Sequence, residues 1–380
     1  MARAALAGLA LLLTLGLGIM PGPVWAAESP LVAQQLHVPT PEGDRDVTLW
    51  VAQGFQVGVF ASGLGSARIL AESPTGELVL SEQWEGQVVK LADRDGDGTA
   101  DERVVILSGL NVPHGLVFAG DVLFVAETDR VLRLDVWWNG ASAREIIRLP
   151  GGGHHLTRSL ALGPDGKLYV SIGSTCDVCR ESDPLRAAVW RFNLDGSGGE
   201  PYATGLRNAV GLAWEPGAGR LWATDNGQDA LGDETPPDEI DVLRPGANYG
   251  WPDCYGQRVP VPGFGDPARC AATEPPLFEL PAHSAPLGLT FSSGPLSPSK
   301  YDGDLFVALH GSTFRSPPVG YSLQHIPMAA GQPGPPADFI RGWLTGSESW
   351  GRPVDPFVAH DGTLYLTDDG AGVVYRVRPG

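Results

Sequence analysis

Short apolar strands, each preceded by a tight turn, recur six times along this chain. The six segments are residues 74–82, 119–127, 164–172, 217–225, 302–310 and 361–369. Each has a glycine in its turn and then a run such as LVLSE, LYVSI or LYLTD. Successive segments lie mostly about 45 to 60 residues apart, with one longer step before the fifth. Periods of this size are typical of propellers and solenoids.

The flanking segments favour a propeller. A Gly-Leu-x-aromatic strand, or a relative of it, precedes most of the six, at residues 115–118, 159–162, 211–214 and 288–291. Another strand follows, as at residues 88–91, 131–134, 189–192 and 373–377. A fourth strand ends in Gly-Leu at residues 61–64, 107–110 and 203–206. Four antiparallel strands per repeat predict six blades.

The two ends of the chain complete one blade. The last repeat stops after its third strand, and a spare strand of the fourth type lies at residues 55–64. Pairing them closes the ring and removes an unpaired sheet edge. We therefore predict an all-β fold, a six-bladed β-propeller closed by its N-terminal strand, as one domain over residues 27–380. Residues 28–50 are expected to pack outside it, and an insertion of roughly 248–281 fills the long step.

Composition agrees with a strand-and-turn fold. The 380 residues include 51 Gly and 34 Pro, which punctuate a chain too often for long helices. The formal net charge of −18 argues against nucleic acid or an anionic membrane as a partner and is compatible with bound cations.

Residues 1–26 have the pattern of a secretory signal peptide, with one charge at Arg3, an apolar run over residues 4–19, and a small-residue site ending at Ala26. We expect cleavage after Ala26 and a secreted or periplasmic protein. An uncleaved anchor is the alternative, although the run is short and prolines follow it. No other apolar run is long enough to span a membrane.

Export favours disulfides for the four cysteines. Pairs 176–179 and 254–270 are favoured among the three possible pairings. A four-cysteine zinc site is a weaker alternative, because the second pair lacks metal-knuckle spacing. Position 180 is Arg rather than His, which excludes a c-type haem motif.

Polar side chains gather in loops that a propeller brings to one face. These loops join each outer strand to the next inner strand, or the second strand to the third. They contain five of the eight histidines and three arginines: His114, His154, His155, His283, His310, Arg207, Arg315 and Arg352. Polar loops alone do not explain so many imidazoles, so we expect a ligand site at this axial mouth.

An acidic loop lies on the opposite face. Asp93, Asp95, Asp97 and Asp101 have the alternating spacing of a calcium-binding loop. The usual Glu at the twelfth position is missing, so the alternatives are a structural Ca²⁺ site and a solvated acidic turn.

Several motifs together resemble the soluble PQQ-dependent sugar dehydrogenases, and most closely the sorbosone dehydrogenase-like branch. They are GGGHHLTRSLALGPDGKLYVSIGS, GLRNAVGLAW, TDNGQD, PPDEIDVLRPGANYGWP, HSAPLGLTF, LFVALHGSTFR and WGRPVD. The resemblance covers most of residues 50–380. It implies PQQ (pyrroloquinoline quinone) in the mouth, with Ca²⁺ beneath the quinone.

The resemblance also implies roles for individual residues. His155 is the general base, His154 supports it, and Arg207 stabilises charge on the quinone oxygen. Asn208 and Asn226 contact the cofactor. The backbone carbonyls of Gly227 and Gln228 hold the Ca²⁺, while Asp238, Glu239 and the Tyr249 carbonyl resemble a second calcium site.

The chain departs from the family pattern at the residues that hold the PQQ carboxylates. His310 stands where close relatives of glucose dehydrogenase carry Lys, and Arg352 alone remains of an Arg pair, because position 354 is Val. Arg315 is the candidate replacement charge.

The predicted activity is oxidation of an aldose or sugar aldehyde, with a cytochrome or quinone-type electron acceptor as partner. The alternatives are a calcium-dependent lactonase-type hydrolase, which needs carboxylates such as Asp225 and Asp368 around an axial Ca²⁺, and a non-catalytic binding propeller. No dinucleotide fingerprint is present.

Overall fold

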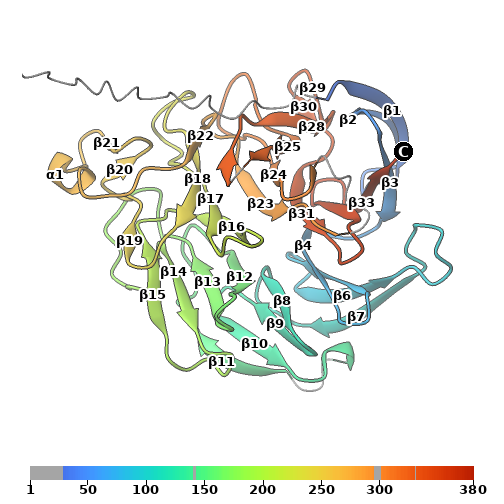
Figure 1. Ribbon diagram of the computed structural model, residues 1–380, viewed down its shortest axis with the longest axis horizontal. Helices are drawn as coiled ribbons and strands as arrows, with labels where there is room; N and C mark the ends of the chain where they lie inside the picture. The colour runs from blue at the N-terminus through green and yellow to red at the C-terminus, as the bar shows by residue number, and fades with distance from the viewer. Residues whose placement is uncertain (1–28, 140–142, 295–300, 330) are drawn as a thin grey trace, which may run out of the picture.

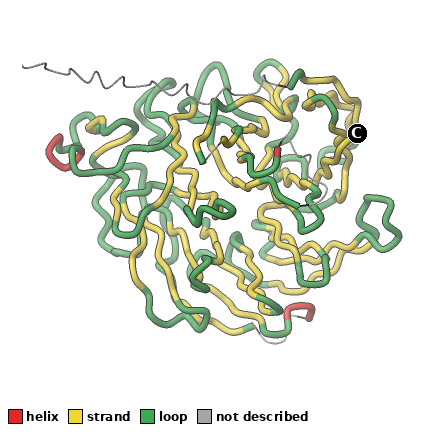
Figure 2. Tube along the Cα trace, viewed as in Figure 1, coloured by secondary structure: helices red, strands yellow, loops and turns green. Residues whose placement is uncertain are grey.

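Six antiparallel sheets surround a central axis in the computed structural model, which describes residues 29–139, 143–294, 301–329 and 331–380 (Figure 1). The proposed signal peptide lies outside the described residues. Strands joined by loops make up nearly all of the trace (Figure 2). The predicted six-bladed propeller is confirmed.

Each blade has four strands, named here from the axis outward. Blade 1 contains β4 (Ala67–Glu72), β5 (Leu78–Glu82), β6 (Gln87–Ala92) and β7 (Glu102–Ser108). Blade 2 contains β8 (Leu116–Ala119), β9 (Val122–Ala126), β10 (Arg130–Leu134) and β11 (Arg144–Arg148). Blade 3 contains β12 (Arg158–Leu162), β13 (Leu168–Ile172), β14 (Ala188–Phe192) and β15 (Glu200–Thr204).

The other three blades follow the same order. Blade 4 contains β16 (Ala209–Trp214), β17 (Leu221–Asp225), β18 (Asp238–Leu243) and β22 (Phe278–Leu280). Blade 5 contains β23 (Pro286–Phe291), β24 (Leu305–Leu309), β25 (Ser322–Ile326) and β28 (Ala337–Arg341). Blade 6 contains β31 (Pro353–Val358), β32 (Leu364–Asp368), β33 (Val373–Pro379) and β3 (Phe55–Ala61).

The ring closes as predicted. β3 pairs antiparallel with β33, from Phe55 opposite Pro379 to Ala61 opposite Val374. The N-terminal strand therefore supplies the outer edge of the last blade. The innermost strands each contact the next around the axis, and β31 contacts β4 (Figure 1).

The predicted fourth strands end two or three residues earlier than the Gly-Leu signature suggests. Gly63, Gly109 and Gly205 have φ of 65°, 73° and 73°, a left-handed conformation that ends a strand and that glycine adopts without strain. The following leucines turn inward, and Leu64 and Leu206 are buried. The signature marks the turn toward the next blade.

The repeating apolar runs are buried on both faces because each blade is covered by its two neighbours. All five residues of β5, β13, β17, β24 and β32 are buried. Between blades 1 and 2, for example, Val79 and Val88 pack with Val125 and Leu132. Burial on both faces explains why these strands do not alternate between apolar and polar residues.

Hydroxyl groups link neighbouring blades near the axis. Ser171 and Thr224, on the second strands of blades 3 and 4, donate to the carbonyls of Ala209 (2.5 Å) and Leu287 (2.7 Å) on the next blade. Glycines in the innermost strands also allow neighbouring blades to approach closely. A Cβ on Gly211 would lie 2.3 Å from the Leu287 carbonyl oxygen, so only glycine permits this approach.

The leader and the insertion lie outside the ring. β1 (Leu31–Val38) and β2 (Arg45–Ala52) form a hairpin that extends blade 5, because β2 pairs with β28. The insertion contains β19 (Ala247–Asn248), β20 (Cys254–Tyr255), β21 (Val259–Pro260) and the helix α1 (Pro267–Cys270). Its last residues form β22, the outer strand of blade 4. Cys254–Cys270 and Cys176–Cys179 are disulfides, which confirms the predicted pairing and excludes the zinc alternative.

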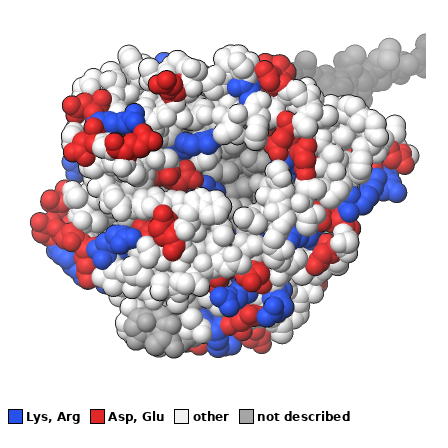
Figure 3. Space-filling model, turned by 180° about the vertical axis from the view of Figure 1, so that it is seen from behind, with Lys and Arg blue, Asp and Glu red and all other residues white. Residues whose placement is uncertain are grey.

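Charged side chains of both signs lie next to one another in several groups on the face drawn in Figure 3. Ion pairs are numerous among the described residues, for example Arg191 with Glu200 at 2.7 Å. Within the described residues, no helix is long and apolar enough to cross a membrane.

Candidate active site and cation sites

A polar pocket of about 160 Å³ opens among the mouth loops of blades 3, 4 and 5. Its lining includes His154, His155, Arg207, Asn208 and Asn226, all of which the sequence analysis placed at the mouth. Gly227, Asp229, Asp238, His283, Ala285 and the run Gly311–Phe314 complete the lining. The structure therefore brings the proposed base, the proposed charge stabiliser and both asparagines together.

A hydrogen-bond relay orients the imidazole of His155. Its Nδ1 lies 2.9 Å from Oγ of Ser174 and 3.2 Å from the Ser174 carbonyl oxygen. The Ser174 hydroxyl donates to the carbonyl of Cys176 (2.7 Å), so its oxygen is left to accept from the imidazole. Both contacts therefore require the proton on Nδ1. Nε2 then carries the lone pair and has no hydrogen-bond partner among the described residues.

Burial keeps the His155 imidazole neutral. Desolvation, and then the positive charge of Arg207, lower the pKa of His155 to about 2. A neutral imidazole with a free Nε2 is the form that can accept a proton, although a pKa this low also makes it a weak base.

Two buried arginines hold the loop that carries the histidines. Arg186 donates through Nη2 to the carbonyls of Pro150 (3.0 Å), Gly151 (2.8 Å) and Gly152 (2.8 Å). Arg158 donates through Nη1 to the His155 carbonyl (3.0 Å). The sequence analysis missed both residues. An arginine near a Gly-rich loop looks the same in the sequence whether its side chain is buried against the loop or exposed at the surface.

Arg207 is fixed by two carboxylates. Its Nη2 lies 2.8 Å from Oδ1 of Asp177 and 2.8 Å from Oδ2 of Asp229, and its side chain is 3% exposed. Nη1 donates to the Asn226 carbonyl (3.1 Å). These bonds come from two loops, the one after β13 and the one after β17, so the guanidinium has one orientation at the pocket.

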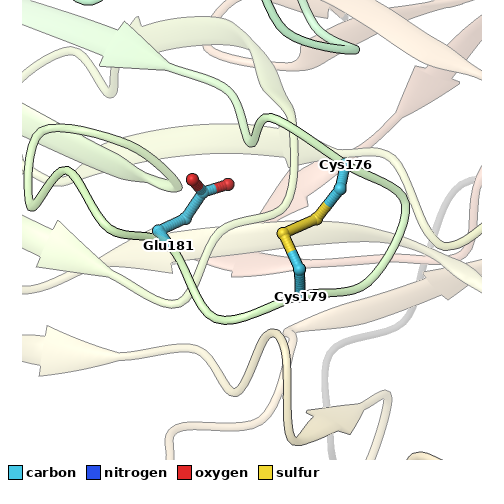
Figure 4. A group of neighbouring side chains, drawn as sticks. All are labelled: Cys176, Cys179 and Glu181. Atoms are coloured by element: carbon cyan, nitrogen blue, oxygen red, sulfur yellow. A yellow bond between two sulfur atoms is a disulfide. The ribbon is translucent and has the colours of Figure 1, made fainter.

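Asp177 lies inside the Cys176–Cys179 disulfide loop. Figure 4 shows this loop, with Glu181 beside it. Glu181 accepts from the backbone N–H of Thr175 (2.6 Å), and Asp177 also accepts from the backbone N–H of Asp229 (2.8 Å). The disulfide thus closes a short loop whose only aspartate orients Arg207.

Buried aspartates shape the two turns that carry the asparagines. Asp225 accepts from the backbone N–H groups of Arg207 (2.9 Å) and Asn208 (2.6 Å). Asp238 accepts from those of Gly227 (2.8 Å) and Ala285 (2.8 Å). Burial raises the pKa of Asp225 to about 7. Asp238, expected at the second calcium site, links the Gly227 turn to the loop before β23.

A second, ion-sized cavity of about 20 Å³ adjoins the pocket, with which it shares Arg207, Asn226 and Gly227. Its lining includes four of the five residues predicted for the two calcium sites, namely Gly227, Gln228, Glu239 and Tyr249, together with Asp225; the fifth, Asp238, lines the larger pocket. A cavity of this size holds about one water molecule or ion.

Three buried carboxylates converge beside this cavity. One oxygen each from Asp225, Glu239 and Asp241 lies within 4.8 Å of the others. Asp241 is fully buried, and among the described residues neither of its carboxylate oxygens has a hydrogen-bond partner; the same holds for the side-chain amide of Gln228. Burial, and then the neighbouring carboxylates, raise the pKa values of Glu239 and Asp241 well above the usual range. Hard oxygen ligands at this density suit Ca²⁺.

The three residues proposed to hold the cofactor carboxylates do not line the pocket. His310 lies 2.8 Å from Oδ1 of Asp369, which also pairs with Arg68 (2.7 Å). Arg315 pairs with Glu234 (2.7 Å) and donates to two backbone carbonyls. The Arg352 side chain contacts the pocket lining, because its Nη2 donates to the carbonyl of Gly311.

The acidic loop of residues 93–101 brings three of its four aspartates together. Asp93, Asp95 and Asp101 each place an oxygen within 4.8 Å of the others, whereas Asp97 is not in the group. The carboxylate of Asp97 accepts from the backbone N–H of Thr99 (2.7 Å). The loop joins β6 to β7, as expected.

Comparison with known proteins supports the resemblance to the sugar dehydrogenases. A family model described as glucose/sorbosone dehydrogenase matches residues 142–315, and one described as TrAA12-like matches residues 263–379. The predicted resemblance to the PQQ-dependent sugar dehydrogenases is confirmed.

Two curated relatives are similar over part of their length. An uncharacterised protein of Borreliella burgdorferi is 37% identical, over 56% of this chain and 57% of its own. The pyrroloquinoline quinone-dependent pyranose dehydrogenase of Coprinopsis cinerea is 25% identical, over 86% of this chain and 54% of its own. The chain thus spans a little over half the length of these relatives.

The solved structure of the holo pyranose dehydrogenase PQQ domain from Coprinopsis cinerea has the same fold. Its TM-score is 0.76 at 22% identity, over 87% of this chain and 97% of that domain.

Proposed function

We propose that this chain is a PQQ- and Ca²⁺-dependent dehydrogenase that oxidises an aldose or a sugar aldehyde. The observation that carries the proposal is the relay from His155 through Ser174 to the Cys176 carbonyl. It leaves the Nε2 lone pair of His155 in a pocket that also contains Arg207, Asn208 and Asn226. The names of the relatives support the choice of cofactor and substrate class.

Each residue of the pocket would have a distinct role in the reaction. His155 accepts the hydroxyl proton of the sugar at Nε2, while its Nδ1–H remains bound to Ser174. Arg207 and the side-chain amides of Asn208 and Asn226 stabilise negative charge at the pocket. Bound PQQ would supply an ortho-quinone that accepts hydride from the substrate carbon.

Calcium is proposed at two places. Gly227 and Gln228 would hold Ca²⁺ at the ion-sized cavity. Glu239 and the Tyr249 carbonyl, expected with Asp238 at a separate calcium site, line the same cavity and are assigned to the same ion, and Asp225 and Asp241 add carboxylates there. Asp93, Asp95 and Asp101, with Asp97, are proposed as the outer structural site. His310, Arg315 and Arg352 remain proposed contacts of the cofactor carboxylates.

The hydrolase alternative has less support. It needs carboxylates from several blades around the axis, but Asp225, Glu239 and Asp241 come from two adjacent strands of blade 4. Asp368, on blade 6, is not in this group of carboxylates; it accepts from the backbone N–H groups of Arg352 (2.7 Å) and Ala371 (2.8 Å). A pure binding ring would not need an imidazole with a prepared Nε2.

We propose that the mature protein is secreted or periplasmic, starts after residue 26, and passes electrons to a cytochrome or a quinone-type acceptor. The two disulfides support an oxidising compartment.

Reconstitution tests the activity. Metal-stripped protein is loaded with PQQ and Ca²⁺, and dye reduction is followed with a panel of aldoses. We expect turnover that requires both additions. PQQ that neither binds nor supports dye reduction at saturating Ca²⁺ would exclude the dehydrogenase.

A further inference from the structure

A large cavity in the part of the chain that the structure describes lies outside the mouth pocket. It is a groove of about 850 Å³ between the β1–β2 hairpin and the loop from β28 to β31, and we call it the hairpin groove. That loop carries the small hairpin of β29 (Leu344–Thr345) and β30 (Glu348–Ser349), which lies close to β28 and β2 in Figure 1.

The groove follows from how β2 joins blade 5. Only Trp50 and Val51 of β2 pair with β28, opposite Arg341 and Ile340. The preceding residues of β2 pair with β1 alone, and they form one wall of the groove, with Thr48 and Leu49 packed closely against Gly342. Thr48 lies on this wall and Trp50 at its base.

Two indole rings face the groove. Trp50 is 43% exposed, high for a large apolar side chain in a strand. Trp350 is held in one orientation, because its Nε1 donates to the Gly342 carbonyl (2.8 Å) and its ring stacks on buried Trp343 at 6.2 Å. The groove therefore offers flat apolar surfaces that are already positioned.

The charges in the groove balance. Arg45 and Arg341 are its cations, and Asp46 and Asp338 are its anions. Arg341 lies opposite Trp50 on one side and Ser322 on the other, so a donor sits between the indole and a hydroxyl. A lining with equal charges favours a neutral ligand rather than a polyanion, and its hydrogen-bonding groups disfavour a lipid.

A neutral saccharide matches this chemistry. A pyranose ring has an apolar C–H face that can pack on an indole, and a rim of hydroxyls that can bond to carboxylates, guanidinium groups and hydroxyls. The volume lies in the range of ligand sites and exceeds that of the mouth pocket. We infer that the hairpin groove is a binding site for a neutral oligosaccharide.

One layer of residues separates the hairpin groove from the mouth pocket. Tyr321 lines the groove, and Gly311 lines the pocket. A Cβ on Gly311 would lie 2.4 Å from the Tyr321 ring, and the Arg352 guanidinium lies 5.5 Å above the same ring. A chain bound in the groove would therefore have an end near the proposed active site. This consequence rests on the proposed function, whereas binding in the groove does not.

The experiment measures binding without catalysis. PQQ-free protein is titrated with neutral β-glucan, α-glucan, xylan and mannan oligosaccharides, followed by calorimetry and tryptophan fluorescence. We expect at least one of them to bind, and we expect Trp50→Ala and Arg341→Ala each to weaken its binding by roughly tenfold or more. Trp138→Ala, which removes another exposed indole (57%), is the matched control and should bind as the parent does.

Three results would overturn the inference. They are no binding by any neutral oligosaccharide, binding by an anionic oligosaccharide alone, or equal affinity in the parent and both groove variants. Circular dichroism and thermal melts establish that the variants are folded. Failure of the dehydrogenase would appear as absent dye reduction with saccharide binding intact, so the two failures are distinguishable.

Discussion

Nδ1 of His155 and Oγ of Ser174 lie 2.9 Å apart, and because the Ser174 hydroxyl is already donated to a carbonyl, this contact places the imidazole proton on Nδ1. The pair thereby prepares Nε2 as the basic nitrogen. In the proposed mechanism, Ser174 is a positioning residue that acts through His155.

Ser174→Ala should lower kcat by roughly tenfold and leave PQQ affinity unchanged. The Ser174 carbonyl, 3.2 Å from Nδ1, still accepts a hydrogen bond from Nδ1–H. The preference for this tautomer is therefore reduced rather than lost. Steady-state kinetics with PQQ-loaded protein measure this. His154→Ala is the control, since His154 is half exposed and should matter less. Loss of activity in His154→Ala with Ser174→Ala unaffected would move the base to residue 154.

Arg352→Ala should weaken PQQ binding more than Arg315→Ala. Arg352 contacts the carbonyl of Gly311 at the pocket, whereas the Arg315 guanidinium binds Glu234 and two backbone carbonyls that do not line the pocket. A lost charge-assisted contact corresponds to about 1.5–3 kcal/mol, or roughly ten- to a hundredfold in affinity. PQQ titration by absorbance measures both. A larger effect at Arg315 would show that its loop rearranges around the cofactor.

Asp241→Asn should reduce the rise in melting temperature that Ca²⁺ produces. A ligand bound only to the native state stabilises it by mass action, and the buried carboxylate is a proposed ligand. The double variant Asp95→Ala with Asp97→Ala tests the outer loop separately, and its activity at low temperature should persist. Calcium titrations of unchanged amplitude in either variant would show that the corresponding carboxylates bind no ion.

The two disulfides should differ in their effect on the site. Replacing Cys176 and Cys179 by Ser frees the loop that holds Asp177 against Arg207, so PQQ affinity should fall by several-fold. Replacing Cys254 and Cys270 by Ser in the insertion should lower the melting temperature instead. Equal PQQ affinity in the parent and the first variant would show that Arg207 needs no such support.

The buried imidazole of His114 should make stability depend on pH. Burial, then Arg68, lowers its pKa well below 6.5, so the unfolded chain binds a proton that the folded chain does not. Its contribution is complete above about pH 6.5 and is lost as pH falls, by up to about 1.4 kcal/mol per pH unit. Asp225 and Asp355, with pKa values raised to about 7, act in the opposite sense.

Comparing the free energy of unfolding of the parent and of His114→Gln isolates the contribution of His114 to the pH dependence. Urea unfolding between about pH 6 and pH 4 should show a smaller loss of stability in the variant. Parallel curves for the two proteins would mean that His114 is protonated in the folded state.

Much of the fold was predictable because its signal is local and repeated. The turn-plus-strand unit recurs six times, and a repeat that buries both faces leaves the same apolar run at each copy. The ends of the outer strands were placed too late, since Gly-Leu specifies the turn after the strand. The pairing of the leader with blade 5 was not predictable, because it depends on two residues of β2 meeting β28.

Site residues that belong to sequence motifs were predictable, whereas residues whose role depends on burial in the folded protein were not. The mouth loops gave His155, Arg207 and Asn226, which the structure places around one pocket. Asp241 was missed, because an aspartate in a strand looks like a solvent-facing residue until both faces are seen to be covered. Likewise, the pairing of His310 with Asp369 joins two blades and has no signal in the sequence.

The most direct test of the account is the rate at which sugar reduces bound PQQ in the parent and in His155→Gln. Oxidised, Ca²⁺- and PQQ-loaded protein is mixed anaerobically with an aldose, unlabelled or deuterated at the reacting carbon, and the quinone absorbance is followed by stopped flow. The account predicts reduction in the parent, slower with deuterium, and a rate lower by roughly a hundredfold or more in the variant at unchanged PQQ affinity. Reduction at the parent rate in His155→Gln, or no reduction in a parent that holds PQQ, would contradict it.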